Sequence, residues 1–220
     1  PFRSILDRPA HNKKYRQSSI FELNRVCNVT RELNEYFPNT CDPVIVLNAG
    51  GFSKNSFFDN SKKNEMYSLV AESLTKINKS NVKISIQTMP PYPWHFGGQS
   101  FHNLFLDPVE IKDFCDEQDG IYACLDISHT VMACNYYGWD LNDFIKEIGS
   151  NVTHIHISDA LGVDGEGIAI GKGDVNFPEL LKSLDKYTPN ISFIPEIWQG
   201  HKNEGEGFWE ALSFLEGNIT

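Results

Sequence analysis

Five short runs of β-branched and other apolar residues recur at intervals of about 40 residues, and this repeat restricts the fold more than any other feature. The runs cover residues 44–48, 82–86, 121–125, 152–156 and 191–195. Helix patterns lie between them, because parallel strands need a long crossover connection. The sequence therefore predicts an α/β fold with a parallel sheet, in a single domain that covers residues 1–220.

The predicted helices are marked by apolar stripes and by capping residues. Apolar residues at helical spacing predict helices around residues 23–37 and 66–77. Capping signals predict a helix that begins at Pro108 and helices over residues 141–148, 179–187 and 207–215. Five glycines within residues 160–173 predict a flexible loop.

The number of strands falls short of a closed barrel. Eight units of this period would need about 300 residues, and only five strands are legible in this chain, which begins with Pro1. Five parallel strands alone would expose two edges, and exposed edges are prone to pairing. We therefore expect this segment to belong to a longer polypeptide or to cover its edges by association, for example as a homo-oligomer.

Composition excludes several classes of function. With 19 Lys and Arg against 29 Asp and Glu, the net charge is -10 and no basic patch is visible, so we expect no nucleic-acid partner. No apolar stretch approaches the roughly 18 residues of a membrane span, and no signal-peptide pattern opens the chain, so we expect a soluble, cytoplasmic protein. The five cysteines form no Cys-x-x-Cys pair, which favours free thiols in a reducing compartment.

Candidate reactive residues stand at the carboxyl ends of the strands, where parallel α/β folds collect their chemistry. The third and fourth runs end at Asp126 and His156, and Glu196 follows the fifth. We expect these side chains to converge on one rim, as a donor set suited to Mn²⁺, Co²⁺, Mg²⁺ or Zn²⁺. His154 shares a strand face with His156 but lies further from the rim, so a hydrogen-bonded core histidine is the alternative that we favour for His154.

Four motifs together resemble one known family. They are Leu125-Asp126-Ile-Ser-His129, His154-Ile-His156-Ile-Ser-Asp159, Ile170-Gly-Lys172-Gly-Asp174-Val-Asn-Phe177 and Pro195-Glu196. In their order and spacing they are similar to the xylose isomerase-like TIM-barrel superfamily of sugar phosphate isomerases and epimerases. The resemblance implies a (β/α)8 TIM barrel of which this chain holds strands four to eight with their helices.

The same resemblance assigns roles to individual residues. It implies Asp126, His156 and Glu196 as metal ligands and His129 as a substrate contact. Gln87 stands where the sugar epimerases of the family carry a glutamate that binds metal and moves a proton. An amide oxygen can still bind a metal, but an amide cannot act as a general base. One-base chemistry at Glu196 is then expected, with a metal-bound water or His129 handling the second proton.

Further polar and aromatic residues on the predicted rim are candidates for substrate binding. Aromatic faces cover the apolar side of a sugar, while polar side chains bind its hydroxyl groups. Lys172 can bind a phosphate or carboxylate of the substrate, and Glu166 is expected to face the pocket. For Trp94 and Trp198, the alternative is that they only pack their loops. The predicted substrate-binding residues are His129, Lys172, Trp94, His95, Trp198, His201 and Asp159.

These observations favour a metal-dependent isomerase or epimerase that acts on a sugar or sugar phosphate and needs no organic cofactor. The first alternative is a non-catalytic sugar-binding or scaffolding barrel domain of a larger enzyme, since domains of this kind are similar to ones that accompany bacterial polysaccharide or nonulosonate synthesis. The second is metal-assisted hydrolase or lyase chemistry at the same site.

Overall fold

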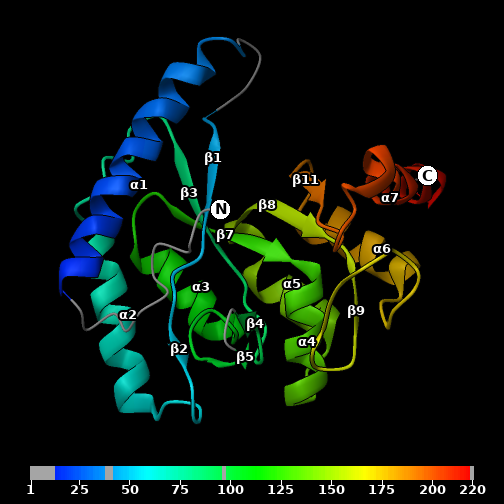
Figure 1. Ribbon diagram of the computed structural model, residues 1–220, viewed down its shortest axis with the longest axis horizontal. Helices are drawn as coiled ribbons and strands as arrows, with labels where there is room; N and C mark the ends of the chain where they lie inside the picture. Colours follow the sequence, from blue (N-terminus) through cyan, green and yellow to red (C-terminus); the bar gives the residue numbers. More distant parts are fainter. Residues whose placement is uncertain (1–12, 38–41, 96–97, 219–220) are drawn as a thin grey trace.

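The computed structural model describes residues 13–37, 42–95 and 98–218, and its centre is a curled, fully parallel sheet (Figure 1). The five strands lie in the order β1-β3-β7-β8-β11, and each pairs in parallel with its neighbour. Their bounds are β1 Val44–Leu47, β3 Lys83–Gln87, β7 Ile121–Asp126, β8 Val152–Ile157 and β11 Ser192–Pro195. All five predicted strands are thus confirmed to within one residue at either end.

Helices alternate with these strands, as the repeat predicts. They are α1 Lys13–Asn34, α2 Asn60–Leu74, α3 Pro108–Glu117, α4 Ile127–Tyr137, α5 Leu141–Ile148, α6 Phe177–Tyr187 and α7 Lys202–Asn218, with a short 3-10 turn at Gly149–Asn151. Carboxylates accept hydrogen bonds from first-turn N–H groups at Asp59, Asp107 and Asp140. Chain order and sheet order coincide, so successive strands are neighbours, as expected of a segment of a barrel.

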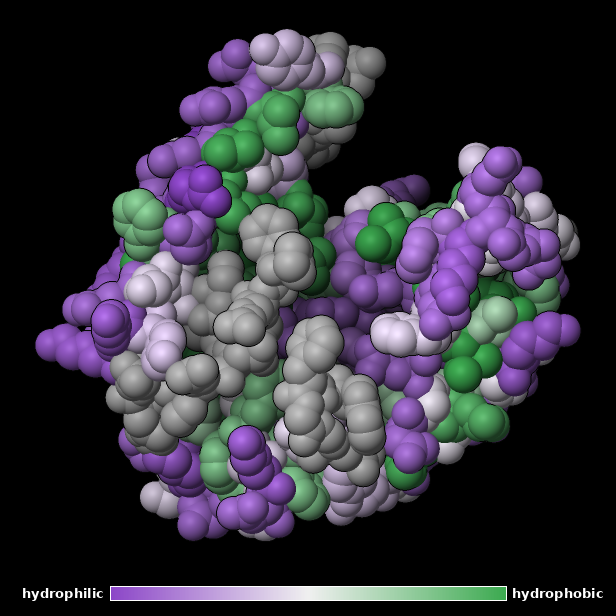
Figure 2. Space-filling view, in the orientation of Figure 1, coloured by the Kyte–Doolittle hydropathy of each residue, from purple (hydrophilic) through white to green (hydrophobic). Residues whose placement is uncertain are grey.

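The core fills the space between the sheet and its helices. The largest fully buried side chains include Ile84, Ile86 and Leu125 from the sheet, and Phe144 and Ile145 from α5. A space-filling view shows the face of the molecule hollowed between the side built by α1 and the side built by β11 and α7 (Figure 2). Among the described residues, β1 and β11 each pair on one side only, so the predicted association of the sheet edges stays a prediction.

Two local structures differ from the sequence analysis. No helix is predicted directly after the third strand, but β7 ends at Asp126 and His129 lies in the first turn of α4. The helix begins there because the carboxylate of Asp126 accepts a hydrogen bond from the backbone N–H of His129 at 3.0 Å.

The second correction concerns the glycine-rich segment predicted as a flexible loop. Part of it forms an antiparallel hairpin, β9 (Asp159–Leu161) with β10 (Gly165–Ile168). Gly162, in the turn of this hairpin, has a φ of 62°, which glycine adopts without the strain that a Cβ atom would cause. Two smaller hairpins pair β2 (Phe52–Ser53) with β6 (Phe101–His102) and β4 (Trp94–His95) with β5 (Gly98–Gln99).

α7 contains the predicted helix over residues 207–215 but begins with an irregular turn. Asn203, Glu204 and Gly205 have φ angles of 48°, 62° and 88°, in the left-handed region. None of the described helices is both long and apolar enough to cross a membrane. The predicted cytoplasmic location stays a prediction.

Four of the five cysteines are buried free thiols, and Cys41 lies outside the described residues. Burial, together with the charges of Asp116 and Asp140 respectively, raises the pKa of Cys115 and of Cys134 to about 12. Because the thiolate is the reactive form, we expect both thiols to stay unmodified by a disulfide reagent at pH 8 until the protein unfolds. Rapid labelling of either one in the native protein, detected by mass spectrometry, would show that the helices open at that position.

The same thiols are expected to lower the stability of the fold at alkaline pH. Below an ordinary thiol pKa of about 8.5 both states are protonated, and above it the unfolded chain loses protons that the folded chain keeps up to about pH 12. The free energy of unfolding should therefore fall as the pH rises through this window, as urea denaturation would measure, and this fall should shrink in the Cys115→Ser variant.

Candidate metal centre

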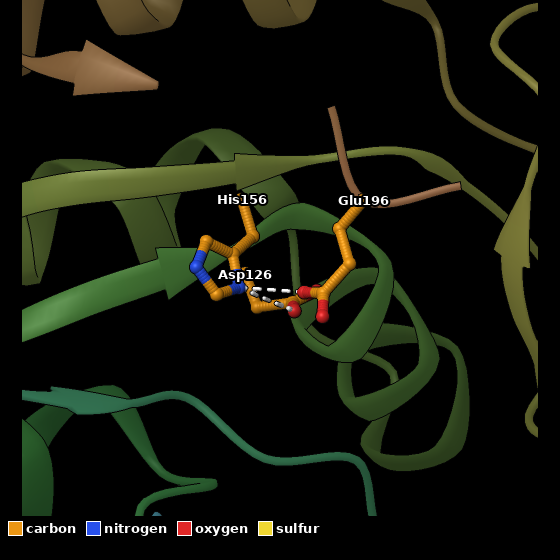
Figure 3. Close-up of side chains that lie close together, drawn as sticks. All are labelled: Asp126, His156 and Glu196. Atoms are coloured by element: carbon orange, nitrogen blue, oxygen red, sulfur yellow. Dashed lines mark ion pairs between the residues drawn. The ribbon is translucent and has the colours of Figure 1, made fainter. Parts of the chain in front are cut away.

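Three adjacent strand ends bring Asp126, His156 and Glu196 together (Figure 3). Asp126 is the last residue of β7, and its register partner in β8 is His156. Glu196 directly follows β11, and its backbone N–H donates to the carbonyl oxygen of Ile157 at 3.1 Å. One potential ligand atom of each side chain lies within 4.8 Å of the other two. Parallel pairing thus produces the convergence that the sequence predicts.

His156 contacts both carboxylates. His156 Nδ1 lies 2.6 Å from Glu196 Oε2 and 3.6 Å from Asp126 Oδ2. Asp126 and His156 are buried, whereas 54% of the Glu196 side chain is exposed. The cluster therefore has a closed floor and one carboxylate that reaches solvent.

Gln87, at the end of β3, completes the group. Its Nε2 donates to Asp126 Oδ2 at 2.8 Å and lies 3.2 Å from His156 Nδ1. Rotation of the Gln87 amide would turn its oxygen toward the cluster in place of Nε2. All four residues predicted as metal ligands thus lie in one cluster, at the ends of four successive strands of the sheet.

Mutual interactions set the charges in this cluster. Burial lowers the pKa of His156, but hydrogen bonds with Asp126, Cys124 and Glu196 outweigh it and raise that pKa to about 12. Burial raises the pKa of Asp126, but the charge of His129 and the hydrogen bond with His156 outweigh it and lower that pKa to about 2. Without a metal, the cluster is held together by a protonated imidazole between carboxylates.

His129 lies beside the cluster and is held at both ring nitrogens. Nδ1 is 2.9 Å from the carbonyl oxygen of Thr88, and Nε2 is 3.1 Å from Glu166 Oε1. Both neighbours are acceptors, so both nitrogens donate and the ring is an imidazolium. Burial lowers the pKa of His129, but the charge of Asp126 and the contact with Glu166 raise it to about 9.

A cavity of about 480 Å³ opens beside these residues. It is lined by Asp126, Ser128, His129, Ser158, Glu166, Gly167, Glu196, Ile197, Trp198, Gln199, His201 and Lys202. The predicted substrate contacts His129, Trp198 and His201 are therefore part of one pocket. Trp198 is 77% exposed and so stands at its rim, free of the packing role that was its alternative.

Two further predicted substrate contacts, Lys172 and Asp159, do not line this cavity. Lys172 is exposed outside this cavity lining. Asp159 is fully buried, and its carboxylate accepts hydrogen bonds from three backbone N–H groups, those of residues 160, 173 and 175. Trp94 and His95 form β4, but their side chains lie outside the described part of the structure. His154 donates or accepts a hydrogen bond at Ser192 Oγ, 2.8 Å from its Nδ1, in keeping with the structural alternative.

Two residues of the site carry no sequence signal. Thr88 Oγ1 accepts from the backbone N–H of Asp126 at 2.9 Å, and its carbonyl oxygen orients His129. Ser128 Oγ accepts from the backbone N–H of Gly167 at 3.0 Å and so attaches the β9–β10 hairpin to α4. A threonine after a strand and a serine at a helix start are too common to be singled out without the fold.

The whole described architecture matches one family. Residues 4–217 match the model of the xylose isomerase-like TIM barrel, and the chain therefore belongs to this family. The predicted family and fold class are confirmed.

Solved structures agree on the fold. A D-tagatose 3-epimerase-like protein superposes with a TM-score of 0.69 at 19% identity, over 100% of this chain and 78% of that one. An L-ribulose 3-epimerase has a TM-score of 0.66 at 15% identity, over 98% and 71%. The protein IolI, solved with a bound zinc atom, has a TM-score of 0.66 at 13% identity, over 95% and 72%. At these identities the likeness shows the fold.

Curated relatives cover less of the chain. Two uncharacterized proteins of Methanocaldococcus jannaschii, MJ1614 and MJ1311, are 30% and 28% identical over 105 and 118 residues. These matches cover 48% and 54% of this chain, and only 36% and 38% of the relatives' own lengths.

The contacts of Asp159 generate a test of its role. Asp159→Ala leaves three backbone N–H groups without their charged acceptor, so we expect unfolding to become easier by about 3 kcal/mol in urea denaturation. Asp164→Ala, an exposed carboxylate of the same hairpin, is the matched control and should stay within about 0.5 kcal/mol. Wild-type stability of Asp159→Ala would return this residue to the list of substrate contacts.

Proposed function

We propose that this chain carries the active site of a divalent-metal-dependent isomerase or epimerase that acts on a sugar or sugar phosphate. The observation that supports the metal is the cluster itself, two carboxylates and an imidazole whose ligand atoms lie within 4.8 Å of each other. Ligands of one ion at about 2.1 Å stand about 3 to 4 Å apart, so small side-chain movements bring this set to coordination distance. Asp126, His156 and Glu196 would hold the ion, with the amide oxygen of Gln87 as a fourth ligand.

A divalent ion bound there would polarise neighbouring carbonyl and hydroxyl oxygens of a sugar and make the C–H bond between them more acidic. We assign the removal of that proton to Glu196, and the proposal is supported by its carboxylate, which borders the cavity and reaches solvent. His129 presents Nε2–H to the same cavity and can donate to a substrate oxygen. Trp198 and His201 supply an aromatic face and a polar group at the rim.

The position of Gln87 favours isomerisation over epimerisation. Inversion at carbon requires a proton to leave on one face and return on the other, and a second general base is missing at the end of β3, where Gln87 carries a neutral amide. A single carboxylate can take a proton from one carbon and return it to the adjacent carbon on the same face. The same amide is also what favours the second candidate, a non-catalytic sugar-binding domain.

Metal binding should release a proton. His156 has a pKa of about 12 without a metal, and a ligand imidazole must be neutral. We therefore expect Mn²⁺ or Zn²⁺ binding at pH 7 to release about one proton and to tighten about tenfold per pH unit between pH 7 and 9. Titration calorimetry in buffers of different ionisation enthalpy measures both.

Asp126→Ala should lose the stoichiometric ion, whereas Asp164→Ala should keep it. Binding without proton release, or an Asp126→Ala variant with unchanged affinity, would place the metal elsewhere.

The reaction class is tested by hydrogen exchange at carbon. Metal-loaded protein, incubated in D₂O with aldoses, ketoses and their phosphates, should place deuterium on the carbon beside the carbonyl group, as mass spectrometry detects. Glu196→Gln should slow this by about 100-fold or more, because the base is lost. Glu210→Gln, an exposed glutamate of α7, serves as the control and should match wild type.

Each alternative predicts a different outcome. Hydrolysed products without deuterium at carbon would indicate the hydrolase or lyase reaction at the same site. Sugar binding without turnover or exchange for any metal would indicate the non-catalytic domain, and the isomerase proposal would then be wrong.

A further inference from the structure

A carboxylate of the protein itself already fills one ligand position in the cavity. Glu166, on β10, places Oε1 3.1 Å from His129 Nε2, the nitrogen that faces the cavity. About half of the Glu166 side chain, 49%, is exposed, whereas the His129 side chain is 9% exposed. A half-exposed carboxylate therefore covers the cavity-facing ring nitrogen of a buried histidine.

The hairpin that carries Glu166 is attached at both sides. The backbone N–H of Gly167 donates to Ser128 Oγ at 3.0 Å, and its carbonyl oxygen accepts from the N–H of Trp198 at 2.8 Å. A Cβ at Gly167 would lie only 3.1 Å from the nitrogen of Trp198, so the two segments are closely packed. The backbone is therefore fixed while the Glu166 side chain remains able to swing out into solvent.

Charge determines what can replace this carboxylate. The other fixed donor position of His129, Nδ1, is taken by the carbonyl oxygen of Thr88. When Glu166 leaves, Nε2–H loses a charged acceptor, and a neutral hydroxyl group would restore only about half the strength of that hydrogen bond. His129 also lies in the first turn of α4, where the helix favours negative charge. His201 and Lys202 line the same cavity.

We propose that the space at His129 Nε2 is an anion subsite, occupied by Glu166 in the resting protein and taken over by a carboxylate or phosphate oxygen of the ligand. This proposal rests on the proposed function. It makes acidic sugars or sugar phosphates the preferred substrates, rather than neutral sugars. Glu166 then acts as a specificity-determining residue, because a ligand binds only if its own oxygen displaces that of Glu166.

The test uses anion binding to metal-depleted protein, so that it is independent of metal chemistry and turnover. Inorganic phosphate, acetate and neutral D-xylose are titrated into wild type, Glu166→Ala and Asp164→Ala, and the ring nitrogen resonances of histidine are followed by NMR. Removing the internal competitor raises the open fraction of the subsite, so Glu166→Ala should bind phosphate or acetate about tenfold more tightly than wild type. The His129 Nε2 resonance should shift, and D-xylose binding should not change.

The controls separate this subsite from general charge effects. Asp164→Ala removes a negative charge from the same hairpin and should bind anions as wild type does. Adding His129→Gln to Glu166→Ala should abolish the gain in anion affinity. If that double variant does not fold, the shift of the His129 Nε2 resonance in Glu166→Ala shows whether the anion binds at this nitrogen.

A gain for phosphate alone supports sugar phosphates, and a gain for acetate supports acidic sugars. Equal anion affinity in Glu166→Ala and wild type would overturn the proposal, as would an equal gain in Asp164→Ala. Because no metal is present, failure of the isomerase proposal would leave these results unaffected.

Discussion

The ionised carboxylate of Asp126 is the group on which both the local fold and the site depend. One oxygen caps α4 through the N–H of His129, and the other accepts from Gln87 and faces His156. A buried carboxylate is costly unless it is fully partnered, and here backbone, amide and imidazolium partners surround it. The same residue therefore ends β7, begins α4 and joins four strand ends into one cluster. Replacing it would remove a helix cap and a proposed metal ligand together.

Much of the fold could be predicted from sequence because period and capping are local signals. The five strands and the caps at Asp107 and Asp140 follow from residue type and spacing alone. Convergence of Asp126, His156 and Glu196 follows as well, since neighbouring parallel strands end at one rim. Two local features were missed: α4, which follows β7 directly, was not predicted, and a glycine-rich stretch expected to be a flexible loop pairs as a hairpin. Whether such a stretch pairs depends on contacts with Ser128 and Trp198, which sequence spacing does not reveal.

The residues that line the cavity were harder to predict than the proposed metal ligands, for a physical reason. The proposed ligands stand at strand ends, whereas the cavity is enclosed by segments whose paths depend on tertiary contacts. Trp198 and His201 line the cavity, whereas the Asp159 carboxylate binds backbone N–H groups of its own loop and Lys172 is exposed outside the cavity lining. Glu166 reaches His129 only because the hairpin folds over α4. The pocket thus combines a rigid floor on the sheet with a rim built by β10 and the segment after β11.

Because Gln87 carries an amide, the site lacks a second carboxylate that could act as a general base. The proposed chemistry therefore depends on whether the cluster binds a metal ion. The most direct measurement is anomalous X-ray diffraction from crystals soaked in Mn²⁺ or Zn²⁺, recorded on both sides of the metal's absorption edge. The account predicts one strong anomalous peak between Asp126 Oδ2, His156 Nδ1 and Glu196 Oε2, within about 2.3 Å of each. Absence of a peak there at saturating metal, or a peak on other residues only, would contradict it.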